Sequence, residues 1–569
     1  MQMFSRHGDT EARILVPGKA QGEVLVCAEG LSFWGGVDPS TGRIIDVHHP
    51  DHGRSVSRKV LLMPTSRGSC SGSGVLLQLS LSGHAPAALV FCEDEEVLTL
   101  GALVSDRIFG RSLPTLRLPR AHYDRLALGQ SATISESRLV AGDLDIALAP
   151  THPERLRLSG NDRALLEGEG GAATQLAMEV ICSMAAAYGT EELTEVTRGH
   201  IDGCILAHEA NLIFAEKLAG LGARVAVPTT INAISVDREN WRAQGVPGEF
   251  GDRASRLADA YVRMGARASF TCAPYLLADP PARGESLGWS ESNAVIFANT
   301  VLGARTPKHP DYLDLFIAMT GRAPKAGVYT AEGRRPFRIL AIDAPPEVDD
   351  AFWPLLGWLA GKLSPDLVPL VTGLEHLNPT TDDLKGLCAA FGTMSGAPML
   401  HIAGHTPEAH FAPAPGAERI GAGPGDLAAA WRELNRGGTE IDLVAVGSPH
   451  VSVREARLIA ELFGDRRCGP STGMIVTIGR DVLRQCRSEG ILDRLEGAGV
   501  RVIPDLCWCS ITEPVFPVGT RSLMTNSGKY AHYSHGLSGV HARLGSLADC
   551  VEAAVTGRAP EAEPAWLSG

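Results

Sequence analysis

The sequence predicts an α/β protein with a compact, strand-rich α/β domain over residues 1–150 and a larger α/β domain over residues 155–569. Three observations support this prediction. The chain has 569 residues, which is long enough for two to four domains. Short Val- and Leu-rich runs bounded by Gly and Pro fill the first 150 residues. From about residue 155, runs of helical length alternate with short apolar runs, as they do in parallel α/β sheets.

The first domain contains four stretches that are typical of β-strands. They read ARILVPGKAQGEVLVCAEG (12–30), KVLLMPTSRGSCSGSGVLLQL (59–79), PAALVFCEDEEVLTLGALVSD (86–106) and SATISESRLVAG (131–142). The segment SGSGVLLQLSLSG (71–83) predicts a helix that begins after a glycine-rich turn. Residues 148–171 are polar and contain proline, so they predict a linker to the larger domain.

The larger domain begins with two helical patterns, at residues 173–189 and 211–222, and the second leads into the apolar run ARVAVPTT (223–230). Later strand candidates are FRILAIDAPP (337–346), PMLHIAGHTPEA (398–409), IDLVAVGSPHVS (441–452), MIVTIGRDVL (474–483) and VRVIPDLCWCS (500–510). Several of them end in Gly, Ser, His or Cys. Open α/β sheets bind ligands at such strand ends.

Charge and composition favour a small-molecule partner. The net charge is -13 and no long Lys/Arg run is present, which argues against nucleic acid or an acidic membrane surface. The N-terminal residues lack the pattern of a secretory signal. The apolar runs are shorter than the roughly 20 residues of a membrane helix. The 12 cysteines are scattered, unlike those of a secreted disulfide-rich protein. We therefore expect a cytoplasmic protein, either a monomer or a small homo-oligomer.

A Gly/Ser-rich turn, TSRGSCSGSG (65–74), lies between a predicted strand and a predicted helix. Its backbone N–H groups could bind an anion, and Ser69, Ser71 or Ser73 could present a hydroxyl there. A serine needs activation before it acts as a base or nucleophile, and Arg67 is a neighbouring cation. A flexible turn without chemistry explains the same residues.

Two cysteines flank a tryptophan in PDLCWCSITEP (504–514). If residues 505–510 are extended, the side chains of Cys507 and Cys509 leave the same face and both sulfurs can point at one object. The alternative is that both are small buried hydrophobic residues, because free cysteine is among the most buried residue types. The segment alone leaves both interpretations open.

Further polar residues lie near predicted turns. RGHIDGC (198–204) is expected to lead into a helix, and Cys272 is expected to end a strand before proline. Glu291 and Ser292 open an apolar helix, and a serine there would cap it. Lys529 follows a Ser-Gly turn, a position that suits a substrate carboxylate.

Eight motifs together resemble aconitase X, a branch of the aconitase superfamily. They are SRGSCSGSG, HIDGC, VPTTINAISVD, CAPYL, GHTPEA, GSPHVS, NSGKYAHY and the long run GESLGWSESNAVIFANTVLGARTPKHPDYLDLFIAMTGRAP (284–324). The resemblance spans nearly the whole chain. It implies a small swivelling β/α domain followed by a large aconitase-like multi-layer α/β domain, fused in one chain, that together enclose the active site.

The resemblance also implies roles for particular residues. Ser69 would be the catalytic base and Lys529 would close the pocket, while the substrate would contact Arg67, Gly203, Cys204, Asn232, Glu291 and Ser292.

The resemblance further implies an iron–sulfur cluster. Cys272 and Cys507 match two of the three family cysteines, and Ser448 of GSPH stands at the third position. A hydroxyl is a weaker and harder ligand than a thiolate. We therefore expect Cys204 or Cys509 to complete the site, and a [2Fe-2S] cluster or a mononuclear iron rather than a [4Fe-4S] cluster.

The resemblance to the fused members of this family implies that this protein dehydrates cis-3-hydroxy-L-proline to Δ1-pyrroline-2-carboxylate. In that reaction a base removes the α proton, iron assists loss of the 3-hydroxyl, and Lys529 and Arg67 stabilise the carboxylate. The two-subunit members imply phosphomevalonate as the alternative substrate. Two other classes fit less well: a Ser/Lys amidohydrolase, whose paired-serine pattern is missing, and an iron–sulfur RNA-binding sensor, which the negative charge disfavours.

Overall fold

The computed structural model describes residues 11–567, so residues 1–10 of the predicted first domain and residues 568–569 of the predicted second lie outside it. Residues 11–150 form one unit, which we call the N-terminal unit. Its elements are β1 (Arg13–Val16), β2 (Ala20–Val26), β3 (Leu31–Ser32), β4 (Val60–Leu62), β5 (Ser66–Arg67), α1 (Gly72–Ser82), β6 (Ala88–Phe91), α2 (Val97–Phe109), β7 (Thr115–Arg117), α3 (Arg120–Leu126), β8 (Ser131–Ile134), β9 (Arg138–Ala141), β10 (Leu144–Ala147) and β11 (Ala149–Pro150).

The N-terminal unit is built on a mixed sheet, with strand order β10-β9-β8-β2-β4-β6-β7-β1-β11 among the described residues. The central strands β4 and β6 are wholly buried, as the unbroken apolar runs VLL and ALVF require. The predicted strands are confirmed at β1, β2, β4, β6, β8 and β9, but the strand expected at residues 97–106 was wrong. Those residues form the start of α2, where the Glu95 carboxylate accepts from the Leu98 and Thr99 N–H groups. The predicted helix α1 is confirmed in position and is followed by Gly83 in a left-handed conformation. A separate pairing of β3 with β5 holds the serine-rich turn.

Residues 148–171 are more ordered than the predicted linker. They contain β11, the 3₁₀ turn η1 (Pro153–Arg155) and helix α4 (Gly160–Leu166). Ser159 and Asp162 form a capping box at the start of α4, and the buried Asp162 carboxylate pairs with Arg322 at 2.8 Å. The segment is therefore docked onto the following part of the chain.

The central part of the chain surrounds a small parallel sheet of order β14-β13-β15. Its elements are α5 (Ala172–Ala187), β12 (Leu193–Glu195), β13 (Arg198–Ile201), α6 (Glu209–Gly220), β14 (Thr229–Ile231), α7 (Gly248–Arg263), η2 (Pro274–Leu276), β15 (Leu287–Trp289), α8 (Ser292–Phe297), the π-helical turn η3 (Ala298–Leu302), α9 (Leu313–Thr320), β16 (Arg322–Pro324), η4 (Gly327–Tyr329) and η5 (Glu332–Arg334).

Three local expectations for this part were wrong. The strand expected in residues 223–230 begins only at Thr229, after Pro228, because proline has no N–H for a sheet ladder. The motif at residues 198–204 begins with strand β13, and α6 starts only at Glu209. Cys272 lies in a bend before η2 rather than at a strand end.

The last third of the chain forms two parallel sheets, β19-β18-β17-β20 and β23-β22-β21-β24-β25. Their elements and helices are β17 (Arg338–Ile342), α10 (Phe352–Leu363), β18 (Pro369–Thr372), α11 (Thr381–Met394), β19 (His401–Ile402), β20 (Glu418–Ala422), α12 (Pro424–Leu434), β21 (Leu443–Val451), α13 (Val453–Phe463), β22 (Gly473–Ile478), α14 (Arg480–Ser488), α15 (Ile491–Gly497), β23 (Val500–Pro504), β24 (Leu523–Thr525), α16 (Gly528–Ser538), β25 (Ala542–Leu544), α17 (Leu547–Thr556) and η6 (Ala565–Leu567).

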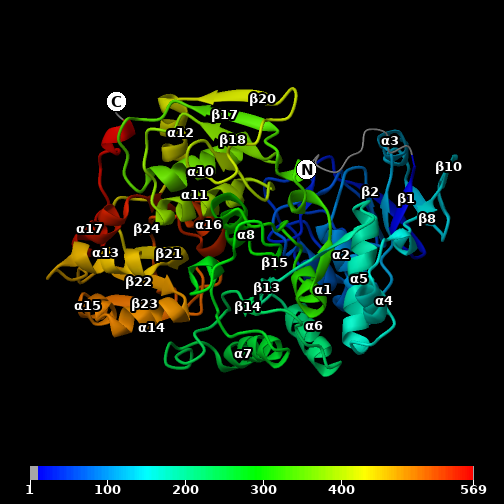
Figure 1. The fold of residues 1–569 in the computed structure, drawn as a ribbon, viewed down its shortest axis with the longest axis horizontal. Coiled ribbons are helices and arrows are strands. Elements are labelled where there is room, and N and C mark those ends of the chain that lie inside the picture. The colour runs from blue at the N-terminus through cyan, green and yellow to red at the C-terminus, as the bar shows by residue number, and fades with distance from the viewer. Residues whose placement is uncertain (1–10, 568–569) are drawn as a thin grey trace.

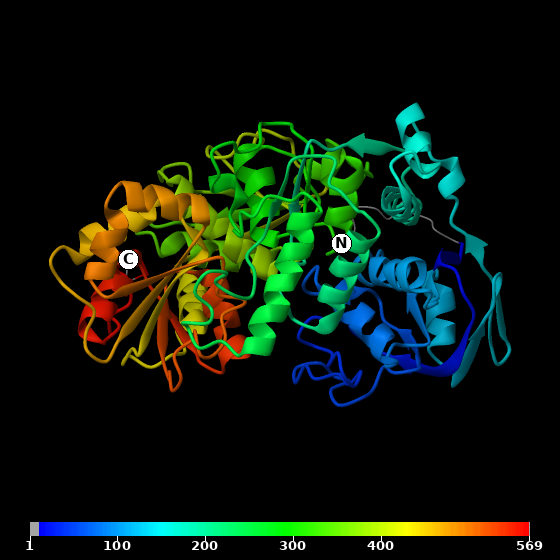
Figure 2. The same cartoon turned by 90° about the horizontal axis from the view of Figure 1, so that it is seen from below.

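The N-terminal unit and the β21–β25 sheet lie at opposite ends of the molecule. Figure 2 shows the blue N-terminal unit on one side, the orange and red C-terminal elements on the other, and the green central part between them. Figure 1 shows α8 and β15 near the middle of the molecule. Within residues 11–567, no helix is both long and apolar enough to span a bilayer.

Candidate functional site

The serine-rich turn presents Ser69 between β5 and the N-terminus of α1. The turn requires glycine at position 68, because its φ is +88° and a Cβ atom would lie 2.3 Å from the Ser32 Oγ. The Ser71 backbone N–H donates to the Ser69 Oγ at 3.3 Å. Arg67 is exposed, and its guanidinium donates to Glu29 at 3.0 Å. The half-buried Ser69 hydroxyl is thus held by backbone geometry rather than by a neighbouring cation.

Ser73 has a structural position that differs from that of Ser69. It is completely buried, and its hydroxyl lies 3.1 Å from the Cys70 carbonyl and 3.0 Å from the Asp311 carbonyl. The Asp311 N–H in turn donates to the Cys70 carbonyl at 3.3 Å. These bonds join the serine-rich turn of the N-terminal unit to the central part of the chain.

A cluster of acidic groups and one thiol lies beside this turn. The Cys70 thiol donates to the Asp202 carboxylate at 3.3 Å, and one donor atom from each of Cys70, Asp202 and Asp311 lies within 4.8 Å of the others. Burial is the main cause that raises the pKa of Asp202 to about 6, and the nearby Glu291 carboxylate adds to this effect. Burial also raises the pKa of Asp311 well above its ordinary value. The sequence analysis missed these three residues, although Asp202 lies inside the HIDGC motif.

Asn232 and Cys204 lie on either side of Asp202. The Asn232 amide donates to the Asp202 carboxylate, and Cys204 is buried with its thiol 3.2 Å from the Ile201 carbonyl. Between Asp202 and Cys204, the Gly203 carbonyl accepts a bond from the Tyr261 hydroxyl at 3.2 Å. The predicted residues Gly203, Cys204 and Asn232 are therefore gathered around the half-buried Asp202 carboxylate.

An ion pair joins Glu291 to Lys529, 238 residues later in the chain. The two charged atoms are 3.0 Å apart, and the side chains are 7% and 12% exposed. Burial disfavours both charges, but Lys529 together with the Ala294 N–H and Asn293 brings the pKa of Glu291 below its ordinary value. In the same way Glu291 and the nearby thiols raise the pKa of Lys529 well above its ordinary value despite burial.

Both members of this ion pair are fixed by helix ends. The Glu291 carboxylate caps α8 by accepting from the Ala294 N–H at 2.8 Å, and Ser292 is the first residue of that helix. Lys529 lies in the first turn of α16, which Ser527 caps by accepting from the Tyr530 N–H. The expectation that a serine caps α8 was wrong, because Glu291 takes that position.

Three cysteines meet next to Lys529. The Cys507 thiol interacts with the thiols of Cys272 and Cys509, and the contact with Cys272 is the main reason that the pKa of Cys507 is raised to about 12. Residues 507–510 form a turn in which the Ser510 N–H donates to the Cys507 carbonyl at 2.8 Å. The segment is therefore not extended as expected; the turn, rather than strand alternation, brings Cys509 to Cys507.

His450 connects the two cysteine segments. Its backbone N–H donates to the Cys272 Sγ at 3.4 Å, and its Nδ1 lies 3.1 Å from the Thr271 hydroxyl. Its Nε2 lies 2.7 Å from the Leu506 carbonyl, which requires a proton on Nε2 and leaves Nδ1 as an acceptor. Burial lowers the pKa of His450 to about 4, so the ring is neutral.

Ser448, two residues before His450, stands at the end of the same strand β21. Its hydroxyl is buried and has no hydrogen-bond partner within the described part of the chain, while its carbonyl accepts a bond from Ser527. A buried polar atom without a partner is rare.

Lys308 is a second buried cation at the site, and the sequence analysis missed it. Its ammonium donates to the Ser395 carbonyl at 2.7 Å, and burial lowers its pKa to about 8. Cys70, Glu291 and Lys529 all act on it, so the serine-rich turn and the ion pair border one interior region. Lys529 links this region to the thiols of Cys272, Cys507 and Cys509. The only sequence signal for Lys308 was its place in the run at residues 284–324.

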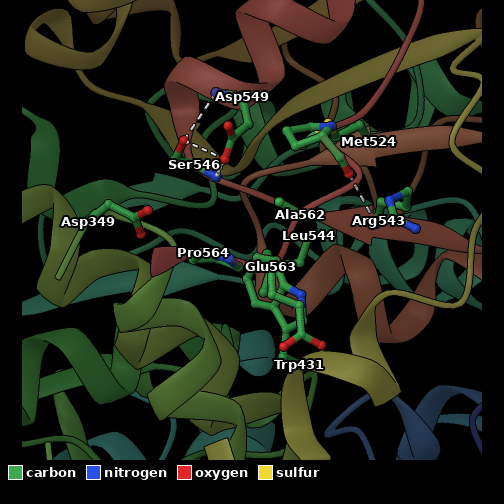
Figure 3. A pocket seen from close by; sticks show the side chains of 11 residues that line it. Asp349, Trp431, Met524, Arg543, Leu544, Ser546, Asp549, Ala562, Glu563 and Pro564 are labelled. Carbon is green, nitrogen blue, oxygen red and sulfur yellow. Dashed lines mark hydrogen bonds between the residues drawn. The ribbon is translucent and has the colours of Figure 1, made fainter. Parts of the chain in front are cut away.

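A cavity of about 250 Å³ lies elsewhere, between α12, β25, α17 and the C-terminal segment (Figure 3). Its lining includes Trp431, Arg543 and Glu563, and Ser546 and Asp549 beside it bond to each other. It contains none of the predicted site residues, so we place the functional site at the convergence of the thiols, the ion pair and the serine-rich turn.

Comparison with known proteins identifies four family domains in the chain. They are the aconitase X swivel domain (residues 9–141), first domain (155–332), second domain (336–432) and third domain (441–556).

Relatives with names and structures match these regions. A cis-3-hydroxy-L-proline dehydratase of Pseudomonas aeruginosa is 48% identical over 98% of each chain, and one of Hypocrea jecorina is 42% identical over 100% of this chain and 98% of that protein. The phosphomevalonate dehydratase large subunit of Methanothermobacter thermautotrophicus is 32% identical over 68% of this chain and 96% of its own length. The crystal structure of Thermococcus kodakaraensis aconitase X superposes with a TM-score of 0.63 at 29% identity, covering 70% of this chain and 100% of that chain.

Removal of the Lys529 charge should destabilise the protein increasingly as pH rises. In Lys529→Met, Glu291 stays buried without its cation, which costs about 3–5 kcal/mol when the carboxylate is charged. Its pKa in the folded state should then rise above the ordinary 4.5. The folded state would bind more protons than the unfolded state above that pH, so stability should fall as pH increases. Thermal unfolding at pH 5 and pH 8 measures this effect.

The matched control is the double variant Lys529→Met/Glu291→Gln, which removes both charges and should recover most of the loss at pH 8. Equal melting temperatures for the single and double variants at pH 8 would show that the ion pair does not stabilise the fold.

Proposed function

Because the chain belongs to the aconitase X family, we propose that it is a hydro-lyase that converts cis-3-hydroxy-L-proline to Δ1-pyrroline-2-carboxylate. The observation that supports this proposal most directly is the match over at least 98% of the chain to relatives named for that substrate. The phosphomevalonate dehydratase large subunits match only about two thirds of the chain and are more distant.

The donor set at the thiol cluster fits an iron–sulfur centre. Soft thiolates are the ligands that such centres use, and the contacts of Cys507 with Cys272 and Cys509 support these three as its holders. The position of Cys204 beside Asp202 gives it less support as a ligand. We propose a [2Fe-2S] cluster or a mononuclear iron, with the unpartnered Ser448 hydroxyl nearby. Once bound, the iron supplies a Lewis acid for the departing 3-hydroxyl.

We propose that Ser69 is the base that removes the α proton of the substrate. The backbone N–H of Ser71 and the start of α1 favour negative charge on the Ser69 oxygen. That oxygen lies 3.9 Å from the Cys70 sulfur, which contacts the Asp202 carboxylate at 3.3 Å. The serine proton can therefore pass to Cys70 while the thiol proton passes to Asp202, whose pKa of about 6 leaves it ionised at neutral pH. The resulting alkoxide removes the α proton as the C3–O bond breaks.

We propose that buried cations hold the substrate carboxylate. Lys529 keeps its charge at neutral pH and borders the thiols, and Lys308 is the second cation of the region. Arg67 has less support in this role because it is exposed and paired with Glu29. Gly203, Asn232, Glu291 and Ser292 complete the proposed pocket, since they surround Asp202 or the ion pair.

Turnover assays on the iron-replete protein test the substrate. We expect formation of Δ1-pyrroline-2-carboxylate from cis-3-hydroxy-L-proline, poor reaction of trans-3-hydroxy-L-proline and no reaction of phosphomevalonate. The reason is that a phosphate needs additional cationic ligands, and the fused relatives are named for the imino acid. Turnover of phosphomevalonate without turnover of hydroxyproline would reject the substrate and retain the family.

The role of Ser69 as base predicts a selective loss of activity. Ser69→Ala should lower kcat by at least about 100-fold, as loss of a positioned base does, with unchanged visible absorption and thermal stability. Ser71→Ala keeps the backbone N–H that donates to the Ser69 Oγ but removes the hydroxyl that accepts from Ser69 at 3.3 Å. It is therefore the control for loss of that contact alone, and its effect should be much smaller. Activity like that of the wild type in Ser69→Ala would move the role to another serine or reject a serine base.

The choice between Cys509 and Cys204 as third thiolate predicts different iron contents. Alanine variants of Cys272, Cys507 and Cys509 should each lose iron and visible absorption, because each removes a soft ligand from one centre. Cys204→Ala is the control, and it should retain both. Full iron retention in the Cys507 variant would show that Cys507 and Cys509 only pack in the core. Loss of iron in Cys204→Ala together with retention of iron in Cys509→Ala would make Cys204 the third ligand instead of Cys509.

A further inference from the structure

A second group of metal-ligating side chains lies in the N-terminal unit. Cys27 follows β2, and His49 and Asp51 belong to the long loop between β3 and β4. One donor atom from each of these three residues lies within 4.8 Å of the other two. No step of the dehydration proposed above uses any of them.

The spacing of these donors suits a small tetrahedral ion. Zinc bonds of about 2.0–2.3 Å at tetrahedral angles place neighbouring donors about 3.3–3.8 Å apart. The His49 Nδ1 and the Asp51 Oδ2 are 3.8 Å apart. The donors lie within 4.8 Å of one another, so closure of the group around such an ion needs movement of at most about 1.5 Å.

The three side chains are withdrawn from solvent. Cys27 is completely buried, and the side chains of His49 and Asp51 are 4% and 12% exposed. Burial, reinforced by Asp51, raises the pKa of Cys27 to about 12. The His49 Nε2 is buried and has no hydrogen-bond partner among residues 11–567. A thiol, an imidazole and a carboxylate thus share one space that is withdrawn from solvent.

Neighbouring groups orient the carboxylate and the ring. The Arg54 guanidinium bonds to the Asp51 Oδ1 at 2.5 Å, which leaves Oδ2 on the side of His49. The Asp51 N–H donates to the His49 Nδ1 at 3.1 Å, and coordination through Nδ1 would exchange this bond for a metal bond. Such partners around the ligands are typical of protein metal sites.

We propose that Cys27, His49 and Asp51 bind one Zn²⁺ ion, with water at the fourth position. A thiolate with an imidazole favours zinc over magnesium or calcium, which prefer ligand sets made of oxygen. The ion would tie the loop around residues 44–56 to the end of β2. Because β3 follows Cys27 and pairs with β5, the same tie would support the strand that leads into the Ser69 turn.

Zinc content of the full-length protein tests the site. Protein produced with added zinc, its iron centre intact by visible absorption, is analysed by elemental mass spectrometry. Wild type should hold one more zinc per chain than Cys27→Ala. Cys92→Ala removes another thiol of the same unit from outside the cluster, and it should keep the wild-type zinc content.

Cobalt provides a second readout. Addition of Co²⁺ to the same preparations should produce a thiolate-to-cobalt charge-transfer band in wild type and Cys92→Ala, and no such band in Cys27→Ala. If Cys27→Ala does not fold, His49→Gln is the substitute and should likewise lose the zinc. Equal zinc in wild type and in these variants, or no zinc in wild type after supplementation, would overturn the proposal and leave Cys27 as a core thiol.

Discussion

The buried ion pair between Glu291 and Lys529 is the contact on which the site depends. Each charge alone would be costly in this interior, because removal from water disfavours an ion unless it has a partner. The partners come from two helix ends, α8 in the central part and α16 near the C-terminus. Neither helix can shift along its axis without separating the charges. The pair therefore fixes the distance between the two parts of the chain that border the thiols.

His450 imposes the second constraint, on the cysteines themselves. Cys272 and Cys507 lie in irregular segments that have no sheet ladder to hold them. A neutral imidazole with opposite bonding roles at its two nitrogens links Thr271 to Leu506, the residues just before these cysteines. Its backbone N–H also reaches the Cys272 sulfur. One buried side chain thus replaces the regular structure that neither cysteine segment has.

The parts of the fold that the sequence predicted are those with local causes. The helix α1 could be predicted because its apolar run lies between a glycine-rich turn and Gly83, and α5 because its pattern spans a full helical length. The apolar run at residues 223–230 was wrongly predicted to be a strand throughout, because strand-like composition does not reveal whether a partner strand is present. The turn at residues 507–510 was mistaken for extended chain. Ser510 closes it by bonding to Cys507, and the Ser510 hydroxyl also donates to the Ile234 carbonyl, a contact with a residue far away in sequence that the sequence does not reveal.

The candidate site residues divide in the same way, into those that local sequence patterns predict and those that depend on the assembled fold. Ser69, Glu291 and Lys529 could be found through motifs, because each motif carries its residue within a few positions of a distinctive turn or helix start. Cys70, Asp202 and Lys308 were missed although they lie inside the motifs, because no local pattern distinguishes them from the other polar residues there. Their chemistry arises only where segments more than 100 residues apart meet, as in the contact of Cys70 with Asp202. Burial then changes their pKa values, and burial is a property of the assembled fold.

The position of the proposed base follows from how the N-terminal unit is joined to the rest. The residues that make the junction are the immediate neighbours of Ser69: Cys70 contacts Asp202, and Ser73 contacts the Asp311 carbonyl. Displacement of this unit would therefore separate Ser69 from the Asp202 carboxylate that is proposed to receive its proton. One short turn after β5 thus carries both the proposed base and the residues that contact the rest of the chain. A movement that breaks this contact also displaces Ser69.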